Sequence, residues 1–359
     1  MNEIADFGDG LSHTACTERA PGERIRPLTI SLVIPVFNEE AVLPITLVTL
    51  RSILARMECE YEIIFVNDGS RDRSGEILTS EAAADCRIKV VGFSRNFGHQ
   101  AAVTAGLDFA IGDAVIVMDS DLQDPPDLIP RMVALYREGY DVVSPQRVSR
   151  ESDTWFKRKT AGLFYSLMRH LADTPIPAQV GDFRLLSRGA VLAIRQLREQ
   201  HRFMRGIVAW LGLREAFVPF ERQRRAAGET KYPFWKMLRF SWTAITSFSA
   251  APLRMTIALG LAAVVLAFGY LLYAIVVSMV LNHAVWGWTS LVFLQCFFFG
   301  TTLVCVGLIG EYIARIYEEA KGRPLYVVNR ALNVSLHSDT ARAVVIEPRR
   351  EEVTRLIDA

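Results

Sequence analysis

The first part of the chain alternates short apolar runs with longer stretches of mixed apolar and polar residues. The apolar runs are rich in Val and Ile and are bounded by Gly, Asn, Asp or Pro, which is typical of buried parallel strands. They are Ile30–Val36, Glu62–Val66, Ile88–Phe93, Ala114–Met118 and Asp141–Val143. The stretches between them have helical periodicity. They predict helices at about Glu39–Met57, Asp72–Ala84, Gly98–Ile111 and Asp127–Glu138. This alternation predicts an α/β fold on a parallel sheet with right-handed crossovers.

Two long uncharged runs follow much later in the chain. Met255–Val280 and Ala284–Gly310 contain no Asp, Glu, Lys or Arg, and each exceeds the roughly 20 apolar residues that cross a membrane. In tandem they predict a transmembrane hairpin rather than a buried helix of a soluble protein. Basic residues flank both outer sides of the hairpin, whereas the short connection has none. They are Lys231, Lys236, Arg239, Arg254, Arg315, Lys321 and Arg323. The positive-inside rule then predicts a multi-pass protein of the cell inner membrane with both ends in the cytoplasm.

Composition narrows the classes of function. The 359 residues are 51% hydrophobic and carry a net charge of +1, which excludes the broad basic field of a nucleic-acid-binding protein. The five cysteines form no Cys-x-x-Cys pair, so neither a disulfide framework nor a cysteine metal site is predicted. Met1–Arg26 is polar and lacks the basic-then-apolar pattern of a signal peptide, and it predicts a disordered leader.

Polar side chains follow four of the predicted strands. They are Asn38, Glu39 and Glu40; Asn67, Asp68, Gly69 and Ser70; Ser94, Arg95 and Asn96; and Asp119, Ser120 and Asp121. Ligands of open parallel sheets bind outside the carboxyl ends of the strands. Four polar strand ends on one edge therefore predict a single polar cleft.

Asp119 and Asp121 are the sharpest chemical feature of that cleft. Two carboxylates after a buried strand repel each other unless a cation lies between them. A divalent metal that bridges a pyrophosphate would supply that cation, and Gln123 offers a carbonyl oxygen to the same ion. The alternative for the two acids is ordinary helix capping ahead of Pro125.

Other nucleotide and metal motifs are missing or ambiguous. No G-x-G-x-x-G follows the first strand and no G-x-x-x-x-G-K-[ST] occurs, which argues against a Rossmann dehydrogenase and a P-loop NTPase. His99 and His201 have no spaced His, Cys or Glu partner, so zinc is not predicted, and His99 is interpreted as a first-turn residue of a helix. Asp68 either only forms an Asp-Gly turn or accepts hydrogen bonds from a nucleobase or ribose.

Seven segments resemble the GT-A glycosyltransferases of family 2, and the last four of them resemble its polyprenyl-phosphate branch. They are Ser31–Glu40, Val66–Ser70, Ser94–Gln100, Met118–Asp127, Gly181–Arg184, His201–Gly206 and Gly228–Pro233. The Met118–Asp127 segment carries the resemblance most strongly, and together the segments are more specific than any one of them. That branch includes dolichol-phosphate mannose synthase and bactoprenol glucosyltransferases. The resemblance covers roughly Ile30 to Val328.

The resemblance implies a GT-A (nucleotide-diphospho-sugar transferase) domain with interfacial amphipathic helices and a C-terminal two-helix transmembrane hairpin. The implied segments are a disordered leader (1–27), a cytoplasmic GT-A catalytic domain (28–232), an interfacial helix (233–252), two transmembrane helices (253–314) and a cytoplasmic tail (315–359). Two basic, aromatic and amphipathic stretches, Trp155–Leu171 and Phe234–Phe248, are candidates for docking on the membrane. A core-facing helix is the alternative for each.

The resemblance also implies roles for site residues. Those that bind the donor nucleotide-sugar are Pro35, Asn38, Glu39, Asp68, Ser94, Asn96 and Asp119. Those that hold Mg²⁺ or Mn²⁺ on the donor diphosphate are Asp119, Asp121 and Gln123. Cations for the donor diphosphate or the lipid phosphate are Arg202, Arg205 and Lys231. The implied catalytic carboxylates are Asp121 and Asp182, the second of which lies near the acceptor.

The reaction implied by the resemblance is the inverting transfer of a hexose from a nucleotide-sugar to polyprenyl (undecaprenyl) phosphate. The product is a lipid-linked sugar for modification of a cell-surface glycan. A UDP-sugar is favoured, with glucose first; UDP-GlcNAc, UDP-galactose, GDP-mannose and an aminoarabinose donor stay open. A homo-oligomer, expected as a tetramer, and a separate flippase are the expected partners. The acceptor phosphate, with a second pKa of about 6, is already largely ionised. Asp182 is therefore either a general base or an orienting group for Arg184 or another cation.

Two other functions compete with this one. Processive polysaccharide synthases of the same fold carry a Q-x-x-R-W block and more spans, but Gln200–Met204 does not match that block and two spans cannot enclose a polymer channel. A catalytically inactive scaffold or binding subunit of a membrane glycan-assembly complex is the remaining alternative. The chain has all four residues that the resemblance assigns to the metal or to catalysis, which argues against an inactive protein. They are Asp119, Asp121, Gln123 and Asp182.

Overall fold

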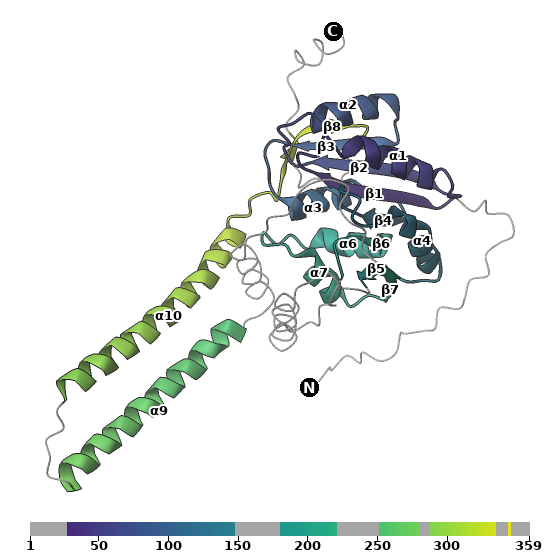
Figure 1. Cartoon of the computed structure of the whole chain (residues 1–359). Helices are drawn as coiled ribbons and strands as arrows, with labels where there is room; N and C mark the ends of the chain where they lie inside the picture. The colour runs from purple at the N-terminus through teal and green to yellow at the C-terminus, as the bar shows by residue number, and fades with distance from the viewer. Residues whose placement is uncertain (1–26, 148–179, 221–250, 281–286, 335–343, 346–359) are drawn as a thin grey trace, which may run out of the picture.

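All five predicted strands form, and they belong to one sheet. The computed structural model describes residues 27–147, 180–220, 251–280, 287–334 and 344–345. The strands are β1 (Thr29–Val36), β2 (Glu60–Asn67), β3 (Ile88–Phe93), β4 (Ala114–Val117) and β5 (Val142–Arg147). Strands β1 to β4 pair in parallel, with β1 between β2 and β4, as the alternation of apolar and amphipathic stretches predicts. Their carboxyl ends therefore lie along one edge (Figure 1).

The sheet is mixed at both flanks, so the prediction of a purely parallel sheet is wrong there. Within the described residues its order is β7-β5-β6-β4-β1-β2-β3-β8-β9. Strand β6 (Arg184–Ser187) inserts antiparallel between β4 and β5, and β7 (Glu215–Phe220) pairs in parallel with β5. Antiparallel strands at the flanks of an otherwise parallel sheet are common. A run of four residues such as β6 is too short to show a period of its own.

The strand after the hairpin returns to the sheet of the domain. Strand β8 (Val327–Leu332) pairs antiparallel with β3 of the same chain. The two-residue β9 (Val344–Val345) then pairs in parallel with β8. The sheet is thus extended by residues that follow the hairpin in sequence.

Helices cover both faces of the sheet. One face packs against α1 (Leu43–Leu54), α2 (Ser74–Ala84) and α4 (Ile129–Arg137), the last preceded by the short helix η1 (Pro126–Leu128). The other face packs against α3 (His99–Phe109), α6 (Arg188–Gln196) and α7 (Met204–Leu211). Strand side chains alternate between these two apolar clusters, which explains why the sequence reads as continuous apolar runs rather than as alternation.

Helix α3 approaches β1 unusually closely at Gly106. A Cβ atom at this position would lie 2.1 Å from Cγ1 of Val33. Both residues are buried at the centre of the domain, so neither can move aside into solvent. This contact positions the N-terminal end of α3, which reaches the carboxyl edge of the sheet.

We expect Gly106→Ala to lower the free energy of unfolding by about 2 kcal/mol, because the cost of overpacking exceeds the gain in helix propensity. The measurement is the denaturation midpoint of the full-length protein in detergent. Gly189→Ala is the matched control, since its added Cβ would meet only Ser187 Oγ, at 3.8 Å. An equal effect in both variants would contradict the close packing of α3 on β1.

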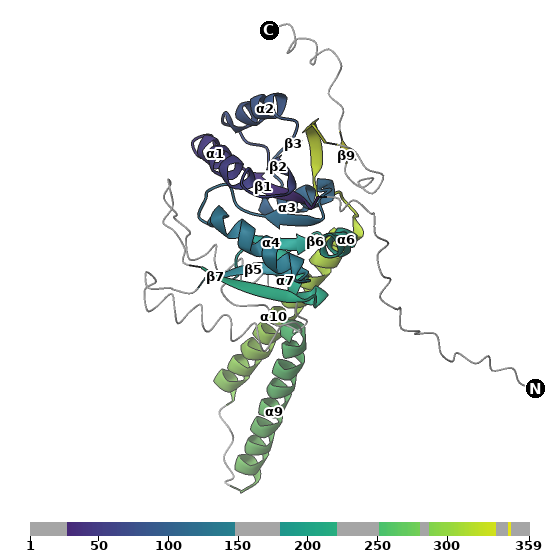
Figure 2. The same ribbon diagram turned by 90° about the vertical axis from the view of Figure 1, so that its right-hand side faces the viewer.

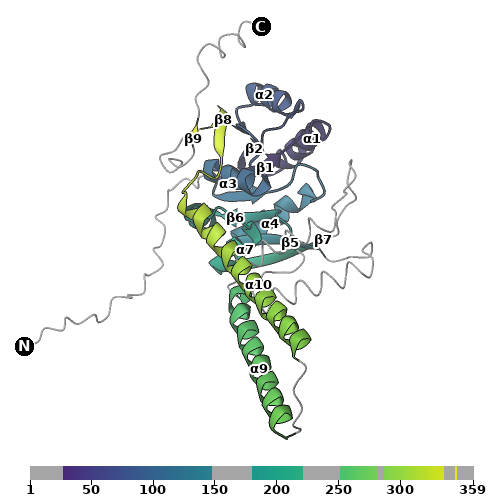
Figure 3. The same ribbon diagram turned by 90° about the vertical axis from the view of Figure 1, so that its left-hand side faces the viewer.

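Two long helices project from the domain side by side (Figures 2 and 3). Helix α9 (Ala251–Val280) and helix α10 (Trp288–Ala320) are long and apolar enough to cross a membrane. The two predicted spans are confirmed as helices, but the second begins later and continues beyond Gly310 to Ala320. In this extension Arg315 Nη2 lies 3.2 Å from Glu311 Oε1, an ion pair between residues four apart on one helix.

Some predictions lie outside the described residues. They are the leader before residue 27, the two amphipathic stretches Trp155–Leu171 and Phe234–Phe248, the Gly228–Pro233 segment with Lys231, and most of the tail after residue 334. The predicted segment boundaries and the interfacial helices therefore stay predictions.

Candidate active site

A cavity of about 340 Å³ opens where the carboxyl ends of β1, β2, β3 and β4 meet. Five residues that were predicted to bind the donor line it, together with the predicted metal ligand Asp121. The five are Pro35, Glu39, Asp68, Asn96 and Asp119. The prediction of a single polar cleft at this edge is therefore confirmed. We call this space the first cavity.

A larger cavity of about 910 Å³ adjoins the first and shares Gly98, His99 and Asp119 with it. We call it the second cavity. Four arginines line it, and they come from widely separated parts of the sequence: Arg95, Arg202, Arg205 and Arg323. Asp182 lies among them. The sequence indicates Arg323 only as a basic residue that flanks the hairpin. Its position just after α10 is the only feature of the sequence that relates it to the second cavity.

His99 stands between two carboxylates at the junction of the two cavities. Its Nε2 lies 3.7 Å from Asp119 Oδ1 and 3.6 Å from Asp182 Oδ2. On the far side of Asp182, Oδ1 accepts a hydrogen bond of 2.9 Å from Arg205 Nε. The interpretation of His99 as only a first-turn residue is incomplete, because the helix it begins carries its ring into the junction.

The charges at this junction are unevenly balanced. Burial would raise the pKa of Asp182, but the contact with His99 and the guanidinium of Arg205 outweigh it and hold that pKa well below its usual range. Burial raises the pKa of Asp119, and the charges of Asp182 and Asp121 raise it further against the opposing effect of His99. Burial would lower the pKa of His99, but its contacts with both carboxylates raise it. Asp119 therefore has less compensating positive charge than Asp182.

Asp68 holds the turn that leads into α3. It is almost fully buried, and its two oxygens accept the backbone N–H groups of Phe97 at 2.7 Å and Gly98 at 2.9 Å. Burial nevertheless raises its pKa. At the next position Gly69 has a φ of 68°, and a Cβ there would meet the backbone carbon of Arg95 at 2.5 Å. Asp68 lines the first cavity, and its contact with a nucleobase stays a prediction.

Three other predicted residues lie outside the lining of both cavities. Asn38 has a φ of 57° and joins the β1–α1 connection to the next loop, since its backbone N–H donates to Ser70 Oγ and its Oδ1 accepts from the Arg71 N–H. Ser94 donates its backbone N–H to the carbonyl of Val327. Gln123, the third, has a buried side chain.

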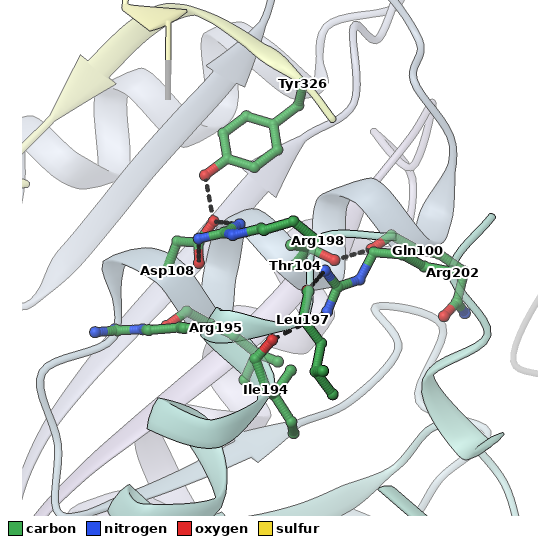
Figure 4. Close-up of polar contacts among 10 residues, drawn as sticks. Gln100, Thr104, Asp108, Ile194, Arg195, Leu197, Arg198, Arg202 and Tyr326 are labelled. Carbon is green, nitrogen blue, oxygen red and sulfur yellow. Dashed lines mark hydrogen bonds and ion pairs between the residues drawn. The ribbon is translucent and has the colours of Figure 1, made fainter. Parts of the chain in front are cut away.

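Arg202 lines the second cavity but already donates to backbone carbonyls. Its guanidinium donates to the carbonyl oxygens of Leu197 and, at 3.4 Å, Ile194 (Figure 4). These bonds orient Arg202 from the C-terminal end of α6. Its predicted contact with a phosphate stays a prediction, as does that of Lys231.

The predicted metal ligands differ in their surroundings. Asp119 and Asp121 line the first cavity, and Asp121 Oδ1 accepts the backbone N–H of Gln123 at 3.1 Å. Between Asp121 and Gln123, Leu122 has a φ of 54°, a left-handed conformation that is strained for a side chain of this size and that is enriched at functional sites. The side-chain Nε2 of Gln123 is buried without a hydrogen-bond partner in the described part of the chain.

Two carboxylates fit a divalent cation that also binds substrate. In the described residues no group of three or more His, Cys, Asp or Glu side chains could enclose a metal by itself. Mg²⁺ is usually held by one or two carboxylates together with substrate phosphates. The raised pKa of Asp119 agrees with this arrangement, because burial and the charges of Asp182 and Asp121 disfavour its ionised form and a bound cation would favour it.

Comparisons with known proteins match most of the chain. The family model "Glycosyl transferase family 2" matches residues 31–195. An uncharacterized glycosyltransferase of Bacillus subtilis is 44% identical over 309 residues, covering 86% of this chain and 96% of that protein. A prophage bactoprenol glucosyl transferase homolog of Escherichia coli is 41% identical over 303 residues, covering 84% of this chain and 99% of that protein. The bactoprenol glucosyl transferase of Shigella phage SfII is 41% identical over 304 residues, covering 85% and 98% respectively.

Among solved structures, this chain is similar to glucosyl-3-phosphoglycerate synthase from Mycobacterium tuberculosis in complex with Mn²⁺, UDP and glucosyl-3-phosphoglycerate. It is 21% identical to this chain and gives a TM-score of 0.46, covering 62% of this chain and 80% of that chain.

Proposed function

Since the chain belongs to glycosyl transferase family 2, in its polyprenyl-phosphate glycosyltransferase branch, we propose that it transfers a hexose, glucose first, from a nucleotide-sugar to polyprenyl phosphate. One observation carries the proposal. An acidic cavity and a cationic cavity meet at His99, Asp119 and Asp182. Two substrates that react with each other need such a junction, because their reacting atoms must come within about 3.5 Å.

The first cavity is the donor site in this proposal. Its position at the carboxyl ends of four strands suits a nucleotide, and its carboxylates suit a divalent cation on a diphosphate. Asp119 and Asp121 would hold Mg²⁺ or Mn²⁺. The ion would stabilise the negative charge that develops on the departing diphosphate.

The second cavity is the acceptor site. Its arginines suit a phosphate monoester, because the guanidinium group offers paired donors in a fixed plane. The residues just after α10 form part of its wall, so a phosphate at the membrane surface would enter it directly. We propose that α9 and α10 cross the inner membrane and that the sheet domain is cytoplasmic, as the flanking Lys and Arg predict.

The residues at the junction have separate tasks in the reaction. An oxygen of the acceptor phosphate forms a bond with the anomeric carbon as the bond from that carbon to the donor diphosphate breaks, and in-line attack inverts the configuration. The second pKa of a phosphate monoester is about 6, so little proton removal is needed. Asp182, with its pKa held low, is a weak base but a strong partner for Arg205. We therefore propose that it orients Arg205 toward the acceptor phosphate.

The first test is transfer of radiolabelled sugar to undecaprenyl phosphate by full-length protein in detergent. The donors are UDP-glucose, UDP-GlcNAc, UDP-galactose, GDP-mannose and UDP-4-amino-4-deoxyarabinose, each with Mn²⁺ or Mg²⁺. We expect one donor to give a lipid-linked product, with activity falling at least a hundredfold in EDTA and returning when the metal is restored. Folded protein that gives no product with any donor would contradict the proposal and favour the inactive scaffold.

A further inference from the structure

The segment after α10 connects three regions of the molecule. Arg323, Pro324 and Leu325 form part of the wall of the second cavity. They follow the C-terminal end of α10 at Ala320 and lead directly into β8, which begins at Val327. One short stretch thus runs from the end of α10 into the sheet (Figure 1), and it forms part of the wall of the second cavity on the way.

Tyr326 fixes this segment to the interior of the domain. Its side chain is only 3% exposed, and its hydroxyl donates a hydrogen bond of 2.7 Å to Asp108 Oδ2 on α3. Asp108 in turn accepts two bonds from Arg198, of 2.7 and 2.8 Å (Figure 4). The ring of Tyr326 stacks on Phe93 at the end of β3, with 5.1 Å between ring centroids. Burial and the carboxylate of Asp108 raise the pKa of Tyr326 far above its usual value, so the hydroxyl stays a donor.

Arg198 connects the other wall of the second cavity, formed by residues between α6 and α7, to the carboxylate of Asp108. It begins the connection between α6 and α7, whose later residues Gln200, Arg202 and Phe203 line the second cavity. The backbone N–H of Gln200 donates to Glu319 Oε1 at 2.6 Å, and its side-chain Nε2 donates to the Arg323 carbonyl at 2.5 Å. The two walls therefore contact each other through Gln200 at the surface, and both are bonded to the buried carboxylate of Asp108.

Asp108, Arg198 and Tyr326 line neither cavity themselves. A bidentate guanidinium–carboxylate pair with a third, phenolic donor allows few alternative geometries, because each donor direction is fixed. A buried charged network of this kind is a stringent constraint on the elements that it joins, and here it joins α3, the α6–α7 connection and the segment after α10. Its effect on the acceptor site is therefore indirect and geometric.

We propose that Asp108, Arg198 and Tyr326 are positioning residues for the lipid acceptor: they hold the two walls of the second cavity at a fixed separation beside the end of α10. The inference rests on the proposed function of the second cavity as the acceptor site. The two walls that the network joins, the α6–α7 connection and the segment after α10, do not line the first cavity, whose turn into α3 is held by Asp68. We therefore expect the network to act on acceptor binding more than on donor binding.

The test is Tyr326→Phe in the full-length protein, which keeps the stacked ring and removes only the hydroxyl. Initial rates are measured in detergent against undecaprenyl phosphate and, separately, against the donor that the wild type uses. We expect the KM for undecaprenyl phosphate to rise about tenfold, and the KM for the donor to stay within about twofold. Arg198→Lys, which keeps the charge but loses the bidentate geometry, should show the same split.

Tyr136→Phe is the matched control, because its hydroxyl also makes one hydrogen bond, of 3.2 Å to the Asp113 carbonyl, outside both cavities. It should leave both KM values unchanged. Equal rises of the two KM values in Tyr326→Phe, or unchanged KM values with only a lower thermal midpoint, would overturn the positioning role. They would assign the network to general stability.

Amide hydrogen exchange separates this inference from the proposed function. Tyr326→Phe should speed exchange in residues 198–203 and 321–326, while Tyr136→Phe should not. If the wild type transfers no sugar, the proposed function is wrong. Hydrogen exchange then tests by itself whether the network holds the two walls of the second cavity in place. Unchanged exchange in those two segments of Tyr326→Phe would overturn it even in an inactive protein.

Discussion

An Asp119→Asn enzyme is expected to lose sugar transfer by about a thousandfold while remaining folded. Asp119 lies at the junction of the two cavities and has less compensating positive charge than Asp182. Asparagine has nearly the same shape but cannot hold a divalent cation by charge. A thousandfold loss corresponds to about 4 kcal/mol of transition-state stabilisation, within the range for one electrostatic contact to a developing charge. The measurements are kcat with undecaprenyl phosphate and the Mn²⁺ dependence of UDP binding, and both should be lost together.

The thermal stability of the Asp119→Asn variant should not fall along with its activity. The pKa of Asp119 is raised in the folded protein, so at neutral pH the ionised carboxylate destabilises the metal-free fold. Removal of that charge should therefore leave the thermal midpoint in EDTA unchanged or higher. Asp127→Asn is the control, because Asp127 is exposed and lines a separate cavity between α1 and α4. Near-normal sugar transfer by Asp119→Asn would contradict the assignment of Asp119 as a metal ligand.

An Asp182→Asn enzyme is expected to lose about a hundredfold in kcat/KM for the acceptor, by the same factor from pH 6.5 to pH 9. Asp182 has its pKa held far below this range by His99 and Arg205, so it stays ionised throughout and does not titrate there. The substitution removes the bond that orients the Arg205 guanidinium, which in the proposed function contacts the acceptor phosphate. The donor KM should change little.

The pH profile distinguishes orientation from proton removal. If Asp182 were a general base, hydroxide would replace it increasingly at high pH, and the activity of the variant would recover as pH rises. Arg205→Lys is the companion variant, because it keeps the positive charge but not the Nε–H geometry of the bond to Asp182. A similar loss in both variants supports an orienting pair. A loss in Asp182→Asn alone would favour the base.

The candidate site was predictable where it depends on local pattern. The ends of the strands can be predicted, since a Val- and Ile-rich run that stops at Asp, Asn or Gly is visible in the sequence. The carboxyl ends of parallel strands necessarily share an edge. Asp68, Asn96, Asp119 and Asp121 could therefore be placed in one cleft without any structure.

The rest of the site depends on contacts that no local pattern shows. The sequence separations among His99, Asp119 and Asp182 say nothing about a shared junction, which exists because α3 lies across the sheet beside an inserted antiparallel strand. Strand β6 is only four residues long and β8 follows the hairpin, so neither has a distinctive period or a neighbouring partner in sequence. Tyr326 and Asp108 are joined across 218 positions. Such pairings arise from tertiary packing, which outweighs local preference.

The return of β8 to the edge of β3 has a consequence for the order of biosynthesis. The ribosome completes β1 to β7 first, then α9 and α10, and only afterwards the strand that covers β3. Until then β3 presents a row of unpaired backbone groups, which is a template for aggregation. The edge of β3 can therefore be covered only after the hairpin has been synthesised. A truncated chain ending before α9 would keep that edge open, so a soluble version for crystallisation needs β8 reattached by a linker.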